Sequence, residues 1–145
     1  VISAIGVIEH LREPKKFFTA FKLSKAKYLY YSVPMFSLSV IFEIIFQNVF
    51  PRQLSGAHTH LFTEKSISKM NDLIGVNSIG EWRFGTDFMD LYRNILFNLK
   101  KQEVSENVIN YFNENFLNNI DNFQPILDKN HSCSEIHVLA KKILK

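Results

Sequence analysis

The chain has 145 residues, of which 46% are hydrophobic and 21% are charged, and its formal net charge at pH 7 is +3. A chain of this length fits one domain, and this composition is typical of a globular protein rather than a disordered one. The excess of basic residues falls between Arg12 and Lys27, a stripe too small to indicate a nucleic-acid partner. We therefore expect a globular protein that does not bind nucleic acid.

The number of cysteines and the apolar segments indicate which cellular compartment to expect. The one cysteine, Cys133, excludes an internal disulfide and fits a reducing compartment, so we expect a cytoplasmic protein. The most apolar segment, residues 35–50, includes Glu43 and is shorter than the roughly 20 apolar residues that a membrane-crossing helix needs. We predict a buried or lid helix there, with an interfacial membrane helix as the alternative, and no stable membrane insertion.

The N-terminal part of the chain predicts a strand, a helix and a second strand. Residues 1–8 form a β-branched run without a turn signal, which is typical of a strand buried on both faces. A helix should begin at Glu13 and Pro14, because proline is tolerated in the first helical turn. The aromatic stretch 27–33, which Pro34 ends, predicts the second strand. Such a βαβ unit implies parallel pairing and a right-handed crossover.

Hydrophobic periodicity and helix-capping residues predict further helices and strands in the rest of the chain. Thr63 is a candidate N-cap, and Gly75 falls where a left-handed residue would end that helix. The remaining expected elements are strands at 78–84 and 135–143 and helices at 87–101 and 105–122. On the two later helices we expect apolar stripes made of Phe88, Leu91, Ile95 and Leu99, and of Val108, Phe112, Phe116 and Ile120. The pattern as a whole indicates an α/β fold.

Titratable residues gather at one predicted edge of the sheet. Glu9 and His10 follow the first strand, and Ser32 lies at the end of the second. In open parallel sheets, ligands bind in the crevice outside these carboxyl ends. The alternative is purely structural, with Glu9 capping backbone N–H groups and His10 half-buried. The five glycines form no phosphate-binding or dinucleotide fingerprint.

A second polar cluster is the sequence HTH, which contains His58 and His60. Alternate residues of a strand point the same way, so two histidines at this spacing could bind one metal ion. The alternative is a loop in which the two rings hydrogen-bond to the backbone.

Three stretches of the chain together resemble one enzyme family. The stretch VISAIGVIEHLREPKKFFTAFKLSKAKYLYYSVP resembles the second half of the Rossmann-like core of class I S-adenosylmethionine-dependent methyltransferases, with its Glu-His pair, its acid-proline helix start and its strand ending in Val-Pro. The stretches GAHTHLFTEKSISKM and NFQPILDKNHSCSEIHVLAKKI are similar to later parts of such chains, especially those found with bacterial sugar and polysaccharide modification. The resemblance covers nearly the whole chain.

The resemblance implies a sheet of strand order 3-2-1-4-5-7-6 with strand 7 antiparallel. Strands 4, 5, 6 and 7 would be residues 1–8, 27–33, 78–84 and 135–143. Strands 1 to 3, the glycine-rich cofactor loop and the ribose-binding acid would be missing, so we expect the isolated chain to be inactive. Residues 1–145 would then be the C-terminal part of a single methyltransferase domain, made of a βαβ core (1–34), an acceptor-side insert (35–64), a helix and strand (65–84), a helical insert (85–130) and a closing strand (131–145).

The resemblance also implies a function and a set of site residues. The implied function is methyl transfer from S-adenosylmethionine to oxygen or nitrogen of a small molecule, such as a sugar or glycan precursor. The alternative is a truncated, non-catalytic domain that serves as a structural or interaction module. The residues that would line the methionine end of the cofactor are Ile5, Gly6, Val7, Glu9 and His10. No pattern indicates an oligomeric state.

His10 is the candidate base, because an imidazole changes charge near neutral pH, and His58 and His60 are weaker candidates. Some relatives bind a divalent metal through a Glu-x-x-Glu-His motif, in which the first glutamate corresponds to Gly6 here. This departure leaves only a partial set, Glu9 and His10 with His58 or His60, so we do not expect a divalent metal.

Overall fold

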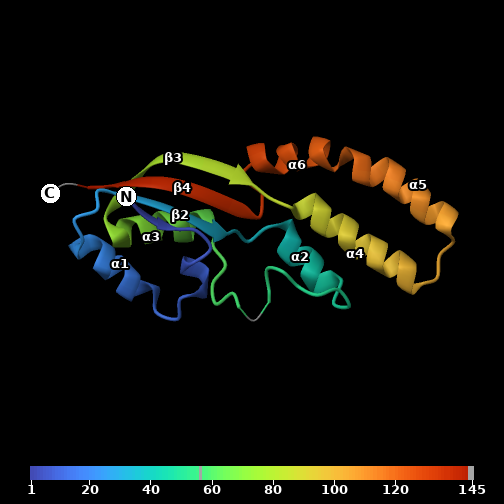
Figure 1. The fold of residues 1–145 in the computed structure, drawn as a ribbon, viewed down its shortest axis with the longest axis horizontal. Helices are drawn as coiled ribbons and strands as arrows, with labels where there is room; N and C mark the ends of the chain where they lie inside the picture. Colours follow the sequence, from blue (N-terminus) through green and yellow to red (C-terminus); the bar gives the residue numbers. More distant parts are fainter. Residues whose placement is uncertain (56, 144–145) are drawn as a thin grey trace. The chain divides into compact units, whose positions relative to one another are not determined.

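The computed structural model describes residues 1–55 and 57–143 and has an α/β fold with one mixed sheet (Figure 1). The four strands of this sheet lie in the order β1 (Ile2–Ala4), β2 (Tyr28–Pro34), β4 (Glu135–Lys142) and β3 (Val76–Phe84). The helices are α1 (Pro14–Leu23), α2 (Leu38–Ile45), α3 (Glu64–Ile74), α4 (Asp87–Lys101), α5 (Glu106–Phe116) and α6 (Ile120–Lys129), with short 3₁₀ turns η1 (Ile8–His10) and η2 (Leu117–Asn119).

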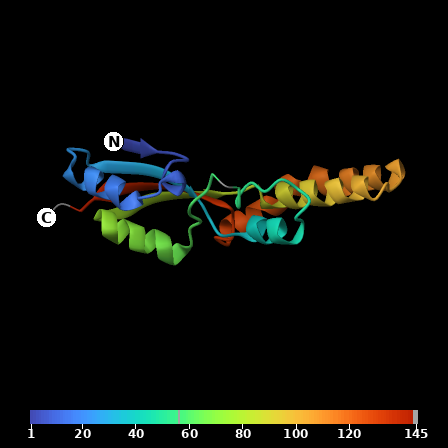
Figure 2. The ribbon, with the colours of Figure 1, turned by 90° about the horizontal axis from the view of Figure 1, so that it is seen from below.

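The described chain divides into two compact units. Unit 1 holds the sheet, α1 and α3, and comprises residues 1–36, 57–83 and 135–143 of the described chain (Figure 2). Unit 2 comprises residues 37–55 and 84–134 and holds α2, α4, α5 and α6. No helix in the described ranges is long and apolar enough to cross a membrane.

The sheet of unit 1 combines parallel and antiparallel pairing. Strand β1 is parallel to β2, with Ala4 beside Tyr31, whereas β4 is antiparallel to β2, with Val138 opposite Tyr31. The strand order and the reversed closing strand are those that the resemblance implies for these four strands, and they are compatible with a Rossmann-like fold. The parallel pair places the carboxyl ends of β1 and β2 at the same edge.

The first strand is shorter than the predicted range 1–8. It ends at Ala4, and Gly6 then adopts a left-handed backbone with φ of 60°. A residue without Cβ tolerates this conformation, which turns the chain out of the sheet and into η1. The prediction of a strand through Ile8 is therefore wrong, because the β-branched pattern carries no signal for the turn.

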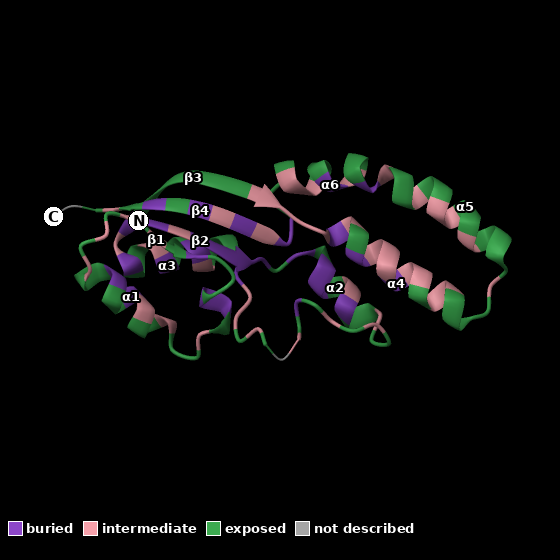
Figure 3. Ribbon diagram, viewed as in Figure 1, coloured by how far each residue is buried: buried purple, intermediate pink, exposed green. Residues whose placement is uncertain are grey.

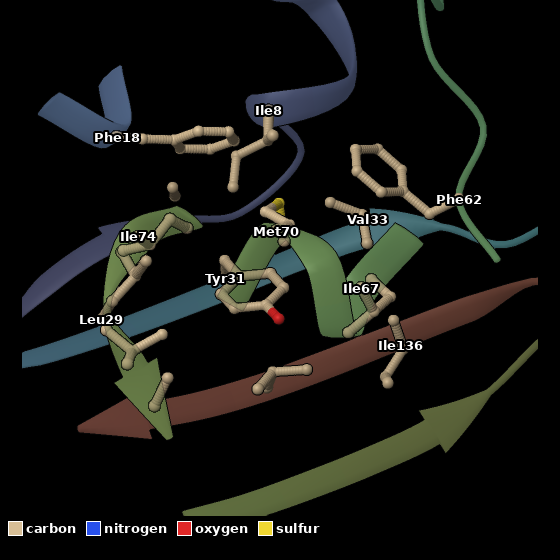
Figure 4. Packing of buried hydrophobic residues seen from close by; sticks show 14 of the residues in the cluster. Ile8, Phe18, Leu29, Tyr31, Val33, Phe62, Ile67, Met70, Ile74 and Ile136 are labelled. Atoms are coloured by element: carbon tan, nitrogen blue, oxygen red, sulfur yellow. The ribbon is translucent and has the colours of Figure 1, made fainter. Parts of the chain in front are cut away.

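The core of unit 1 lies between the sheet and the helices α1 and α3 (Figure 4). Ile136, Val138 and Ala140 of β4 are fully buried, which confirms the alternation predicted for the closing strand. Phe18 and Phe21 pack onto this core from α1, and the members from α3 are Ile67, Met70 and Ile74. Burying each large side chain contributes roughly 1.5–3 kcal/mol, so this layer holds unit 1 together.

Helix α3 begins and ends where the sequence indicates. The hydroxyl of Thr63 accepts a hydrogen bond from the Ser66 N–H, and the Ser66 hydroxyl accepts one from the Thr63 N–H, which makes a reciprocal capping box. Gly75 ends the helix in a left-handed conformation with φ of 76°. Both predicted caps are confirmed, because each depends on neighbours within one helical turn.

Unit 2 departs from the helix predicted at 105–122. Two helices occupy this region, α5 and α6, and the 3₁₀ turn η2 separates them. Around the break, asparagine side chains donate to backbone carbonyls four residues earlier, as Asn115 does to Tyr111 and Asn119 does to Asn115. Such bonds compete with the helical backbone pattern, so the asparagine-rich sequence interrupts the helix.

The buried face of α4 is polar, contrary to the predicted apolar stripe. Its buried residues are Asp87, Asp90 and Asn94, whereas Phe88, Leu91, Ile95 and Leu99 are only partly buried (Figure 3). The ring of Phe88 contacts Phe116 of α5 and Phe123 of α6. The stripe prediction failed because the carboxylates of α4 have buried donors on α2 and on the loops beside it.

Candidate functional site

The edge where β1 and β2 end carries the polar residues that the sequence singled out. The turn after β1 is tied to the end of β2, because the Gly6 N–H donates to the Ser32 hydroxyl at 3.1 Å. Ser32 is buried, and η1 follows directly with Glu9 and His10. The structure therefore brings Gly6, Glu9, His10 and Ser32 to one end of the parallel strand pair.

Glu9 is a buried carboxylate with an incomplete set of partners. The residue is 5% exposed, and its Oε2 atom has no hydrogen-bond partner within the described ranges. Its Oε1 atom lies 3.9 Å from Nε2 of His10. A Cβ at Gly6 would lie 3.8 Å from the same Oε1 atom, so the carboxylate rests beside a residue that has no side chain. A buried carboxylate oxygen without a donor is costly unless a ligand or cation occupies the space next to it.

The loop at 57–60 packs against η1 through backbone contacts. The Thr59 N–H and hydroxyl both donate to the carbonyl of Glu9, at 2.9 and 2.7 Å. Nδ1 of His10 lies 2.6 Å from the carbonyl of Ala57. A carbonyl only accepts, so Nδ1 carries the proton and Nε2 of the neutral ring presents its lone pair toward Glu9.

The two histidines of the HTH sequence separate in the structure. The ring of His58 lies 5.0 Å from that of His10, and Glu9, His10 and His58 each offer a ligand atom within 4.8 Å of the other two. His60 instead turns away, with Nδ1 at 2.8 Å from the Thr59 hydroxyl and its ring beside Phe62. Residues 57–60 form a loop rather than a strand, as in the alternative interpretation, so the rule that alternate residues point the same way does not apply to these two rings.

The remaining residues of the expected cofactor wall line the turn after β1. Ile5 and Val7 are exposed apolar side chains, and Gly6 lies between them. The cofactor role of Ile5, Gly6 and Val7 stays a prediction, as does the role of His10 as a base. Sequence reasoning did not find the contributions of Thr59 and the Ala57 carbonyl, because a backbone acceptor and a loop threonine have no distinctive pattern.

A second polar group lies on the sheet face that points away from the core. The Tyr30 hydroxyl lies 2.6 Å from Nδ1 of His137, and Nε2 of His137 lies 2.9 Å from Oε1 of Glu135. The indole of Trp82 packs against the imidazole, with ring centroids 5.7 Å apart. With Nε2–H donating to the carboxylate, Nδ1 accepts from the phenol, so the three groups hold one another in fixed orientations.

Neither a family model nor a curated protein matches the chain. We therefore infer a function from the residues, the fold and the geometry of the Glu9, His10 and His58 group.

Proposed function

We propose that this chain supplies the acceptor side and one wall of the cofactor site of an S-adenosylmethionine-dependent methyltransferase. The acceptor would be a small molecule methylated on oxygen or nitrogen, such as a sugar or glycan precursor. The main support is the position of Glu9 and His10, which follow the first of two parallel strands at their shared carboxyl end. Ligands of open α/β sheets bind at this edge. The sheet order, with antiparallel β4 beside β2, is also that of the resembling family.

Methyl transfer requires mainly that the acceptor atom be aligned with the methyl carbon of the cofactor. S-adenosylmethionine supplies a methyl group on a positively charged sulfur, and the acceptor atom attacks this carbon in line while the carbon–sulfur bond breaks toward sulfur. Holding the two reactants in this arrangement can contribute several kcal/mol, on the order of 7–11 in well-oriented cases. The turn at Ile5, Gly6 and Val7 would form one side of the cofactor site, and Gly6 leaves space for a close approach.

A hydroxyl acceptor must also lose its proton, and the contacts of His10 support a role as the base that would take it. Its Nδ1–H is held by the Ala57 carbonyl, so Nε2 of the metal-free protein can accept a proton. The Glu9 carboxylate lies 3.9 Å from Nε2, beside the atom that would take the proton. His58 adds a second imidazole on the same side, at a ring distance of 5.0 Å.

The test uses the complete translation product of the reading frame that encodes these residues. Incubation with methyl-labelled S-adenosylmethionine and a panel of sugars and sugar nucleotides should transfer label to an acceptor. His10→Ala should reduce turnover while calorimetry shows retained cofactor affinity, and the control His131→Ala, which lies in unit 2, should change neither. A folded product that does not bind S-adenosylmethionine would overturn the proposal and favour the non-catalytic module.

A further inference from the structure

We propose that Glu9, His10 and His58 bind one divalent transition-metal ion. Two of these residues come from η1 and the third from the loop at 57–60, so the group exists only when that loop is docked. All three belong to unit 1. The sequence led us to expect no metal because Gly6 stands in place of a glutamate, and the proposal departs from that expectation because the fold adds His58.

The spacing of the three groups suits a single ion. Ligand atoms that each lie about 2.1 Å from one ion are separated from each other by roughly 3 to 4.2 Å. Nε2 of His10 and Oε1 of Glu9 are 3.9 Å apart, and every pair of ligand atoms lies within 4.8 Å. Closing the set around an ion thus requires movements of about 1 Å or less at side-chain ends.

The buried carboxylate gives an independent reason to expect a cation. Among residues 1–55 and 57–143, Oε2 of Glu9 has no hydrogen-bond partner, although the residue is 95% buried. No lysine or arginine pairs with Glu9 in the described part of the chain, and its Oε1 atom faces Nε2 of the His10 imidazole at 3.9 Å. An unpaired buried carboxylate is destabilising, and a bound cation would satisfy the oxygen and the charge together.

The hydrogen bond at Nδ1 of His10 is the kind that a metal-ligating histidine makes with its second ring nitrogen. A ligating histidine generally donates its second ring N–H to a carbonyl or carboxylate, which fixes the ring and the tautomer. Nδ1 of His10 meets the Ala57 carbonyl at 2.6 Å and leaves Nε2 for an ion. Thr59 donates two hydrogen bonds to the Glu9 carbonyl and so fixes the loop that carries His58 beside η1, which carries His10.

The donor set favours one class of ion. Two imidazoles and one carboxylate suit Zn²⁺, Co²⁺, Fe²⁺ or Mn²⁺, whereas Mg²⁺ and Ca²⁺ prefer all-oxygen sites. Three protein ligands leave coordination positions open, and Gly6 beside Glu9 keeps one side unblocked. An ion there would act as a Lewis acid on an acceptor hydroxyl and lower its pKa, and His10 would then be a ligand rather than a base.

The test is metal binding by the purified protein after treatment with a chelator. Calorimetry with Zn²⁺ and visible absorption with Co²⁺ should show one equivalent bound, and Mg²⁺ should give no signal. His58→Ala and the isosteric Glu9→Gln should each weaken Zn²⁺ binding at least about tenfold. His60→Ala is the matched control, because His60 lies two residues away and outside the group, and it should bind as the parent does.

Two results would overturn the proposal. One is the absence of Zn²⁺ and Co²⁺ binding by a protein whose circular dichroism shows it folded. The other is equal loss of binding in the His58 and His60 variants, which would indicate unspecific histidine binding. The readout needs no S-adenosylmethionine, so metal binding without cofactor binding would contradict only the proposed function, and methyl transfer without metal binding would contradict only this inference.

Discussion

Asp87 is the buried acid whose replacement offers the sharpest test of how unit 2 is held together. The residue is fully buried at the start of α4, and no ion pair joins it to a cation in the described chain. Its Oδ1 accepts from the Ser37 hydroxyl at 2.6 Å and from the Ser39 N–H at 3.1 Å. Its Oδ2 accepts from the Ser134 N–H at 2.9 Å and from Nε2 of Gln124 at 3.3 Å. These donors come from three segments of unit 2, the start of α2, helix α6 and the residue before β4, so one carboxylate joins segments far apart in the chain.

Asp87→Asn keeps the shape of the side chain but replaces one acceptor oxygen by a donor. One buried backbone N–H, that of Ser134 or Ser39, then faces another donor and loses its partner. Such a loss costs about 1–3 kcal/mol, and the other hydrogen bonds weaken because their acceptor is no longer charged. Relief of the buried charge offsets part of this. We expect a net loss of about 2–3 kcal/mol in the free energy of unfolding.

Urea unfolding followed by circular dichroism at the helical band measures this loss, because α2, α4, α5 and α6 all lie in unit 2. With an ordinary urea slope, the midpoint should fall by about 1–2 M. Asp121→Asn is the control, because Asp121 is an exposed acid in the first turn of α6, and it should leave the midpoint nearly unchanged. A midpoint for Asp87→Asn that matches this control would refute the reasoning, since the carboxylate would then not be the acceptor on which these segments depend.

Three further substitutions test separate parts of the fold. Gly85→Ala should lower the free energy of unfolding by about 1–3 kcal/mol, because a Cβ there would lie 2.7 Å from the backbone nitrogen of Ser134. Gly80→Ala is the control in the same urea titration and should be tolerated, because a Cβ at Gly80 would have no described atom within 4 Å. Burial raises the pKa of Tyr31, so the phenol of the unfolded chain loses its proton at a lower pH than the phenol of the folded chain. The free energy of unfolding should therefore fall above about pH 10, by up to about 1.4 kcal/mol per pH unit. Tyr31→Phe should flatten this slope in unfolding curves measured at several alkaline pH values, and an unchanged slope would show that Tyr31 is not its source. Thr63→Ala removes half of the capping box and should cost about 1 kcal/mol, and a thermal midpoint equal to the parent's would show that the cap contributes little.

The elements that sequence reasoning predicted well depend on neighbours in the chain. Thr63 and Gly75 mark the ends of α3 because a cap is made within one turn of the helix. The alternation along β4 predicted its buried face because successive strand residues point to opposite sides. The range of α4, Asp87–Lys101, also agrees with the prediction.

The candidate site could be predicted only in part. The position of Glu9 and His10 after a strand followed from the pattern, and the fold places them at the same end of the parallel strand pair as Ser32, which the Gly6 N–H contacts. The choice between His58 and His60 did not follow, because it depends on bonds from Thr59 to the Glu9 carbonyl across 50 residues. Such contacts leave no periodicity in the sequence.

The sequence by itself determined the α/β class, the approximate places of the four strands along the chain, the caps of α3 and the placement of titratable residues at the end of β1, because short-range backbone preferences and hydrophobic periodicity set all of these. Only the tertiary structure decided that Gly6 turns the chain early, that α4 buries carboxylates rather than its apolar stripe, and that His58 joins Glu9 and His10. The physical reason is that the partners of a buried polar group come from distant segments, and their positions exist only once the chain has folded.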